Sequence, residues 1–256
     1  MTVLFSDIAQ LLSQFLWPLI RVSALLLAAP FFSLAAVNLR IRVYIIFLLT
    51  WVIYPLVDVP DLDPFSMAAV IGIFHEVLVG GIMGLTLQIV IAALVVAGQA
   101  IAASMGLSMA NMIDPNLGNV PSLSQFFLII GTLLFLSLGG HLIMISVLYS
   151  SFELLPIASG RFSTEMILSL LAWSSEIFVG AVVIAFPIMI GLLLINALLG
   201  LVSRAAPSLN VFAIGFPALI PVGLVMLLLT MSIWFEQVEN LWFVGFSRMN
   251  QVIGGS

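Results

Sequence analysis

One apolar run constrains the fold of this chain more than any other feature. From Ser66 to Ile113 the sequence has about 48 residues and a single charged side chain, Glu76. As one continuous helix this run would be about 72 Å long, whereas the hydrocarbon core of a bilayer is about 30 Å thick. The run is therefore too long for one ordinary membrane span. It either breaks into two spans or packs inside a larger helical assembly.

The composition of the chain indicates a helical membrane protein. Its 256 residues are 63% hydrophobic and 7% charged, with a mean hydropathy of +1.34. These values lie outside the range of soluble domains. The apolar stretches run unbroken, as in membrane helices that satisfy their backbone polar groups internally. We therefore predict an all-α membrane protein.

Several function classes are excluded by what the sequence lacks. It has no lysine and no cysteine, its six arginines are scattered, and its formal net charge is −5. Nucleic-acid binding has no basic patch to depend on, and no disulfide or thiolate metal site can form. No metal-ligand cluster, phosphate loop or nucleophile elbow appears. We expect no enzyme activity, no cofactor and no metal.

Polar breaks divide the chain into apolar runs, several of which contain proline. The runs are Ile8–Val37, Val43–Val57, Met67–Ile113, Leu123–Phe152, Met166–Val202 and Val211–Phe235. Proline removes a backbone hydrogen bond and kinks a helix. We expect kinks at the prolines inside the runs, which are Pro18, Pro30, Pro187, Pro217 and Pro221. A Gly80/Gly84 pair either permits close helix contact or is ordinary membrane glycine.

Charge gives a partial topology. Arg40 and Arg42 predict that the first loop is cytoplasmic, and the acidic loop from Asp58 to Asp63 fits the opposite side. If the long run crosses the membrane once, Arg204 is also cytoplasmic. If the long run is a hairpin, every later loop lies on the opposite side of the membrane. Charge alone does not decide between these two topologies.

Two rows of side chains share neighbouring faces at the end of the long run. Small residues recur at helical spacing at Ala93, Ala97, Ala100, Ser104, Ser108 and Asn111. Met105, Met109 and Met112 follow the same steps beside them, and methionine adapts to changing shapes. The rows either form a compliant seal facing a conduit or pack against sibling helices. The turn formers that follow predict a loop, either buried at membrane depth or simply exposed.

Isolated charges lie inside the apolar runs, where ionisable groups are costly and often functional. They are Arg21, Glu76 and Glu176. We expect them to find buried polar partners in an assembly, with a proton path as the alternative. His75 and Glu76 are adjacent and project about 100° apart on a helix, so we do not expect them to pair. His141 is expected to be a packing residue whose polar atoms are satisfied.

Several short segments together resemble the FliR family of flagellar export proteins and its counterparts in virulence type III secretion. These segments are Met105-Gly-Leu-Ser108, Asp114-Pro115, Gly140-His141, Arg204-Ala-Ala-Pro207 with Leu209 and Phe212, and Ile214-Gly-Phe-Pro217. Their order and spacing match over essentially the whole chain, and the flagellar branch is favoured. One departure is Ser104, where the family often has glutamine.

The resemblance implies a non-enzymatic subunit of the export gate in the bacterial inner membrane. The subunit would assemble with FliP and FliQ, contact FlhB and membrane lipid, and pass unfolded flagellar proteins in transit. It would lie at the flagellar basal body and protrude toward the periplasm. Residues 1–160 would be a FliP-like part and residues 161–256 a FliQ-like hairpin. Long, kinked and broken helices would then form a closed helical stack.

The resemblance also implies a plug loop in the channel. The corresponding residues are Gly106, Leu107, Ser108, Met109, Ala110, Asn111, Met112, Ile113, Asp114 and Pro115, with an extension toward Ser122. The methionine row, Met105, Met109 and Met112, would act as a gasket around the passing chain. Arg204 would contact a gate partner, or would instead cap a helix or meet lipid headgroups.

Two other functions stay open on the sequence. A secondary transporter is suggested by two interrupted segments, Gly106–Ser122 and Ala205–Gly223, with Glu76 as the coupling residue. The chain shows no convincing internal repeat, which argues against a transporter. A purely structural scaffold differs from the channel subunit only in whether Gly106–Pro115 faces the conduit.

Overall fold

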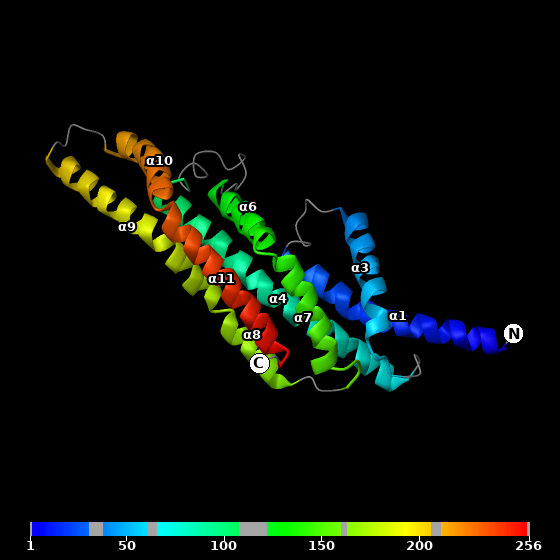
Figure 1. The fold of residues 1–256 in the computed structure, drawn as a ribbon. Helices are drawn as coiled ribbons and strands as arrows, with labels where there is room; N and C mark the ends of the chain where they lie inside the picture. The colour runs from blue at the N-terminus through cyan, green and yellow to red at the C-terminus, as the bar shows by residue number, and fades with distance from the viewer. Residues whose placement is uncertain are drawn as a thin grey trace. The chain divides into compact units, whose positions relative to one another are not determined.

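The computed structural model describes residues 2–30, 38–60, 66–107, 122–159, 163–205 and 211–254, with the side chains of 2–13, 122 and 211–217 left aside. Over these ranges the regular elements are helices (Figure 1), which confirms the all-α class. They are α1 (Thr2–Ala28), α3 (Leu39–Ile53), the 3-10 turn η1 (Tyr54–Leu56), α4 (Met67–Ser104), α6 (Ser122–Ser137), α7 (Gly140–Leu154), α8 (Thr164–Trp173), α9 (Glu176–Ala205), α10 (Val211–Leu229) and α11 (Met231–Val252).

Three stretches are long and apolar enough to cross a membrane as single spans. They are Leu39–Leu56, Met67–Ser104 and Thr164–Ala205. Two further pairs, α6 with α7 and α10 with α11, meet the same test of length and composition only if each broken pair is counted as one span. The prediction of several membrane-spanning helices is confirmed by length and composition.

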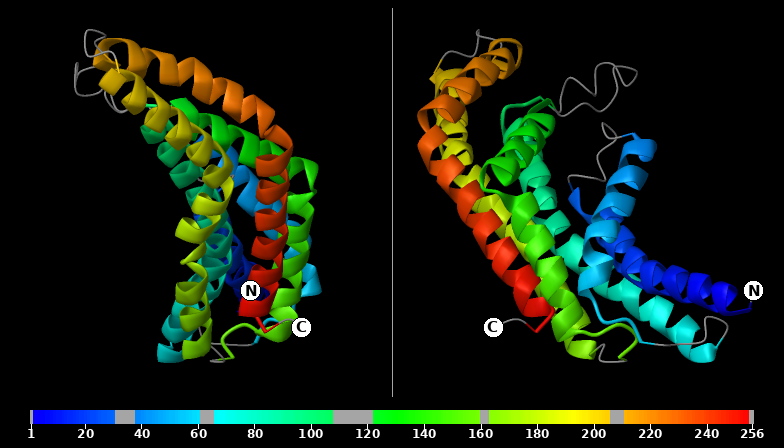
Figure 2. Two further views of the ribbon diagram at one scale, coloured as in Figure 1. Left: turned by 90° about the vertical axis from the view of Figure 1, so that its left-hand side faces the viewer. Right: turned by 45° about the vertical axis from the view of Figure 1, so that its right-hand side comes forward.

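The long apolar run forms one helix through most of its length. Helix α4 continues without a break for 38 residues, which corresponds to about 57 Å (Figure 2). No hairpin turn therefore occurs between Met67 and Ser104. Of the two alternatives for this run, the structure favours a helix packed within protein, because a single span of a 30 Å core needs only about 20 residues.

Most prolines of the apolar runs lie within continuous helices, whereas α1 ends at Ala28, two residues before Pro30. Helix α1 continues through Pro18 and α9 through Pro187, and α10 contains both Pro217 and Pro221. The fourth run breaks instead at Gly139, whose φ of 69° lies in the left-handed region that favours glycine. The sixth run bends by 66° after Leu229. The kinks expected at these prolines stay a prediction, because a helix can continue through a proline and still be kinked.

The chain divides into two compact units, each made of separate segments. Unit 1 contains residues 1–89, 136–174 and 244–256, and unit 2 contains 90–135 and 175–243. The family resemblance implies a boundary between residues 160 and 161. This boundary separates a FliP-like part from a FliQ-like part and is not a boundary between compact units, so it stays a prediction.

Glycines allow close helix packing in both units. In unit 1, a Cβ on Gly84 of α4 would lie 2.6 Å from Ala28 Cβ and 2.7 Å from the Leu25 carbonyl oxygen of α1. Gly80, one turn earlier, meets the α1 backbone in the same way. In unit 2, a Cβ on Gly98 would lie 2.6 Å from Ser124 Cα. The close-contact interpretation of the Gly80/Gly84 pair is confirmed.

Aromatic side chains fill the core of unit 2. The Trp242 indole packs 5.0 Å from the ring of Phe135, between centroids, and donates a 3.0 Å hydrogen bond to the Gly131 carbonyl. Trp234 packs 5.2 Å from Phe127 and donates to the Leu227 carbonyl at 3.0 Å. Both indoles are buried with their N–H groups satisfied, so these bulky residues stabilise the unit without an unpaired polar group.

Candidate functional site

The end of α4 is the first functional candidate, because the predicted plug begins there. Gly106 has a φ of 79°, its N–H donates to the Ala103 carbonyl, and the Leu107 N–H donates to the Ala102 carbonyl, both at 3.0 Å. This pair of bonds around a left-handed glycine is the Schellman motif that ends helices. The Met-Gly-Leu sequence is therefore the stop signal of the long helix.

Met105 anchors this helix end in the core of unit 2. Its side chain is only 1% exposed and lies against Gly223 of α10. A Cβ on Gly223 would lie 2.5 Å from Met105 Cγ and 2.6 Å from Cε. Any larger residue at position 223 would therefore displace the methionine. The segment after Gly106 thus starts from a fixed point.

Only the first residues of the predicted plug can be located. Gly106 and Leu107 are half-buried, while Ser108 to Pro115, including Met109 and Met112, lie outside the described residues. On the small-residue face, Ala93 and Ala97 are buried and Ala93 Cβ lies close to Gly180. Ala93, Ala97 and Met105 therefore pack against helices of this chain, and the two alternatives for the rows, a seal facing a conduit or contact with sibling helices, stay predictions.

A buried ion pair in unit 1 is the second candidate. Arg21 of α1 and Glu76 of α4 are both 0% exposed. Arg21 Nε donates to Glu76 Oε2 at 2.6 Å and Nη2 donates to Oε1 at 3.0 Å. This two-point geometry is the strongest arrangement for an arginine and a carboxylate. The expectation of buried polar partners is met within the chain, 55 positions apart.

The rest of the guanidinium binds the end of a third helix. Nη1 donates to the Ser151 carbonyl at 2.8 Å and Nη2 to the Leu155 carbonyl at 2.8 Å. Carbonyls at the C-terminus of a helix have no partners within it and carry partial negative charge. The Arg21 guanidinium also lies 4.3 Å above the Phe152 ring. One side chain therefore joins α1, α4 and α7.

Glu76 is similarly surrounded. Besides Arg21, its Oε1 accepts a 3.4 Å bond from the Ala158 N–H and lies 3.3 Å from His75 Nδ1. The expectation that His75 and Glu76 would not pair was wrong, because the long carboxylate side chain reaches back to the ring. A carboxylate with this many partners is suited to holding helices in register.

The other charged candidates lie apart from this pair. Glu176 is half-buried at the first turn of α9, where a carboxylate suits the helix dipole. Arg204 is exposed in the last turn of α9, next to residues outside the described ranges. His141 is half-buried, and its Nδ1 has no hydrogen-bond partner among the described residues, so it is not fully satisfied as expected.

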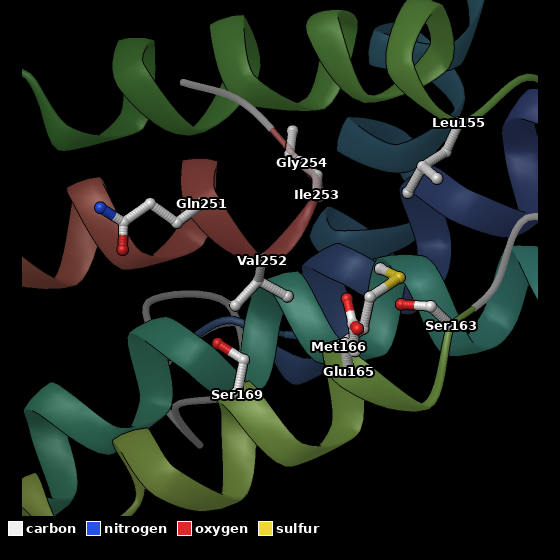
Figure 3. A pocket seen from close by; sticks show the side chains of 9 residues that line it. All are labelled: Leu155, Ser163, Glu165, Met166, Ser169, Gln251, Val252, Ile253 and Gly254. Atoms are coloured by element: carbon white, nitrogen blue, oxygen red, sulfur yellow. The ribbon is translucent and has the colours of Figure 1, made fainter.

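One pocket of unit 1 is lined by several polar side chains. It has a volume of about 340 Å³ and lies where α8 begins and α11 ends (Figure 3). Its lining residues are Leu155, Ser163, Glu165, Met166, Ser169, Gln251, Val252, Ile253 and Gly254. This lining has one carboxylate and no histidine, so it offers no acid–base pair. Across the described ranges, no three metal-ligating side chains come together.

Sequence reasoning found some of these residues and missed others. Arg21, Glu76, Met105 and Gly106 were singled out in advance. Gly223 and the carbonyls of Ser151 and Leu155 were not, since a backbone carbonyl or a lone glycine in an apolar run gives no sequence signal.

Comparison with known proteins agrees with the resemblance. Residues 12–244 match the family model described as Bacterial export proteins, family 1. The chain is 34% identical to the flagellar biosynthetic protein FliR of Pectobacterium carotovorum, over 96% of this chain and 95% of the relative. The FliR proteins of Escherichia coli K12 and Bacillus subtilis 168 are 34% and 31% identical, over 94% and 97% of this chain and 93% and 97% of each relative. The chain therefore belongs to the FliR family of flagellar export proteins.

Proposed function

We propose that this chain is a wall and plug subunit of the flagellar export channel, assembled with FliP and FliQ and in contact with FlhB. Membership of an export family over nearly the whole chain supports a role in the export apparatus. The apolar helices support an inner-membrane location. In this proposal the subunit lies at the basal body, protrudes toward the periplasm and guides unfolded flagellar proteins across the membrane without catalysing a reaction.

The anchored end of α4 is the observation that supports a plug. A loop that closes a channel must leave a rigid support at a defined point and yet be able to move. The Schellman motif at Gly106 and the burial of Met105 against Gly223 provide that support. The plug is proposed to run from Gly106 to Pro115, with Met109 and Met112 as its gasket.

The methionines have different roles in this proposal. Met105 is buried, so it would act by holding the root of the plug, whereas Met109 and Met112 would meet the exported chain. Serine at positions 109 and 112 should raise ion conductance of the assembled complex without reducing assembly. Serine at 105 should reduce stability as well, because it removes a buried side chain.

Assembly is the first test of the proposed function. The chain is purified in mild detergent with and without coexpressed FliP and FliQ from the same genome, and the native mass is measured. We expect one large hetero-oligomer that forms only with both partners. A stable monomer whose native mass is unchanged by coexpressed FliP and FliQ would overturn the proposal.

The geometry argues against the transporter alternative. A coupling carboxylate must gain and lose a proton or ion, yet Glu76 is fully buried and held at two points by Arg21. Glu76→Gln should therefore reduce stability, and a loss of solute uptake by a stably folded variant would instead favour the transporter.

A further inference from the structure

The connection between α7 and α8 contains a backbone conformation that its residue disfavours. Among the described residues other than glycine, Ala158 alone has a positive φ, at 54°. In this left-handed region the Cβ of an L-residue crowds a backbone carbonyl oxygen, and alanine has no polar side-chain atom that could compensate. Other contacts must therefore hold Ala158 in this conformation.

Ala158 is the third residue of a tight turn. The Ser159 N–H donates to the Pro156 carbonyl at 3.1 Å, which closes residues 156–159 into a β-turn. Because φ is positive at the third residue and not at the second, the turn is of type II, which usually has glycine or asparagine at that place. We call residues 156–159 the latch turn. Its alanine makes the closed turn less stable than glycine would.

The buried ion pair of Arg21 and Glu76 holds the latch turn against α4. Glu76 Oε1 accepts a 3.4 Å bond from the Ala158 N–H, and Arg21 Nη2 donates to the Leu155 carbonyl, directly before the turn, at 2.8 Å. Each bond has one charged partner, which makes it stronger than a bond between neutral groups. The Ile157 side chain is buried as well. These contacts offset the conformational cost at Ala158.

A glycine of α4 makes room for the closed turn. A Cβ on Gly72 would lie 3.1 Å from Ala158 Cβ and 2.8 Å from the Trp17 ring. Gly72, His75 and Ala158 also line a mostly apolar pocket of about 360 Å³. The Glu76 carboxylate is fully buried and contacts both His75 and Ala158, so these two residues lie between the pocket and the carboxylate.

We propose that the latch turn opens separately from the rest of unit 1, and that the ion pair keeps it closed. Opening relaxes the backbone of Ala158, exposes Ile157 and lets water from the adjoining pocket reach Glu76. A disfavoured conformation held by one polar cluster is typical of switch segments. Any change that weakens the hold of Glu76 on the turn shifts the turn toward its open state. The inference concerns the chain by itself and does not rest on the proposed function.

Introduced cysteines provide the test, because the chain has none of its own. Ile157→Cys places a thiol in the latch turn, and Met83→Cys places one in α4 of the same unit, where the side chain is fully buried. Membranes from cells that express the full-length chain with either cysteine are permeabilised and treated with a water-soluble maleimide. Mass spectrometry measures the labelled fraction of this chain over time.

We expect the thiol at position 157 to react about tenfold faster than the thiol at position 83, because local opening needs less free energy than unfolding of the unit. Ala158→Gly should slow the reaction at 157 by about fivefold, since glycine adopts a positive φ without crowding. Ala158→Asn should also slow it, because asparagine tolerates this conformation. Glu76→Gln should accelerate it by about tenfold, since the neutral amide loses the ion pair with Arg21.

Gly84→Val is the matched control, because it separates α4 from α1 without touching the turn. It should accelerate labelling at 83 and leave labelling at 157 unchanged. Equal rates at the two positions, changed in parallel by each substitution, would mean that 157 is reached only by unfolding and would overturn the inference. An unchanged rate at 157 in Ala158→Gly would also overturn it, and this variant decides the question if Glu76→Gln fails to fold.

Discussion

Helices α3 and α4 are both apolar enough and long enough to cross a bilayer, but protein surrounds them to very different extents. In the stretch from Leu39 to Leu56, 17% of residues are buried, against 67% in an 18-residue apolar stretch of α4. The side chains differ accordingly. Helix α3 presents bulky residues outward, while α4 places glycines and alanines at its contacts and has a buried carboxylate. A high mean hydropathy is found both in helices that face lipid and in helices that are buried in protein. The size of the residues at the helix contacts distinguishes these two kinds of helix.

The comparison also shows where polar groups can be placed. Helix α3 has its charges, Arg40 and Arg42, only in its first turn, where water and headgroups can solvate them. Helix α4 has Glu76 about two and a half turns from its start, where Arg21, His75 and the Ala158 N–H are its polar partners among the described residues. A charge in the middle of an apolar helix therefore indicates a helix buried in protein.

The largest effect is expected from breaking the buried ion pair. Glu76→Gln leaves Arg21 charged and buried without its counter-ion, and should lower the free energy of unfolding by about 3–5 kcal/mol. Denaturant titration of the purified complex measures it. Replacing both residues, Arg21→Met with Glu76→Leu, should recover part of the loss. If Glu76→Gln were as stable as the unsubstituted chain, α4 would be solvated at this point, and the contrast with α3 would fail.

Adding bulk at the helix contacts should have a smaller effect. Gly84→Val forces α1 away from α4 and should cost about 1–3 kcal/mol. Gly81→Val is a matched control, because a Cβ at Gly81 meets nothing within 4 Å. Thermal unfolding followed by circular dichroism compares the two. Equal melting temperatures would contradict the close packing of these helices.

The contact of Met105 with Gly223, at the end of α4 where the proposed plug begins, provides a third test, and the measured quantity is ion conductance. Gly223→Ala pushes on Met105 and should raise ion leak through the assembled complex, because the helix end that supports the plug shifts. Gly200→Ala, on α9, is the control, since a Cβ there meets nothing within 4 Å. Met105→Ala, which removes the anchoring side chain itself, should also raise the leak. An unchanged leak in Gly223→Ala would separate Met105 from gating.

The smallest effect is expected on α3. Leu48→Ala in detergent should change the free energy of unfolding by less than about 0.5 kcal/mol, because the side chain is exposed. Leu94→Ala in α4 removes a fully buried side chain of the same type and should cost about 2–5 kcal/mol. Similar losses for the two leucines would mean that both helices are buried to the same degree.

The sequence was sufficient for the class of the fold but not for its breaks. Apolar runs predicted the helices, and the 38-residue α4 follows from a run without helix-ending residues before Gly106. Kinks were expected at the prolines, and α9 continues through Pro187, whereas the break at Gly139 was not predicted. The direction of a bend depends on tertiary packing, which periodicity does not encode.

The candidate site was predictable only in its chemistry. Arg21 and Glu76 stood out as charges in apolar surroundings, but 55 positions separate them and no local pattern joins them. Pairing Met105 with Gly223 likewise requires two segments to meet in space. The remaining plug residues, Ser108 to Pro115, lie beyond the described residues, so their role stays a prediction.

Crosslinking to a substrate in transit tests the central claim most directly. An exported flagellar protein fused to a tightly folded domain stalls in the channel, and a photoreactive amino acid in its unfolded part labels the residues that it passes. Mass spectrometry of the labelled chain should place crosslinks within Gly106–Pro115 and none on the outward residues of α3. Crosslinks confined to sibling subunits would contradict the account and leave this chain a scaffold.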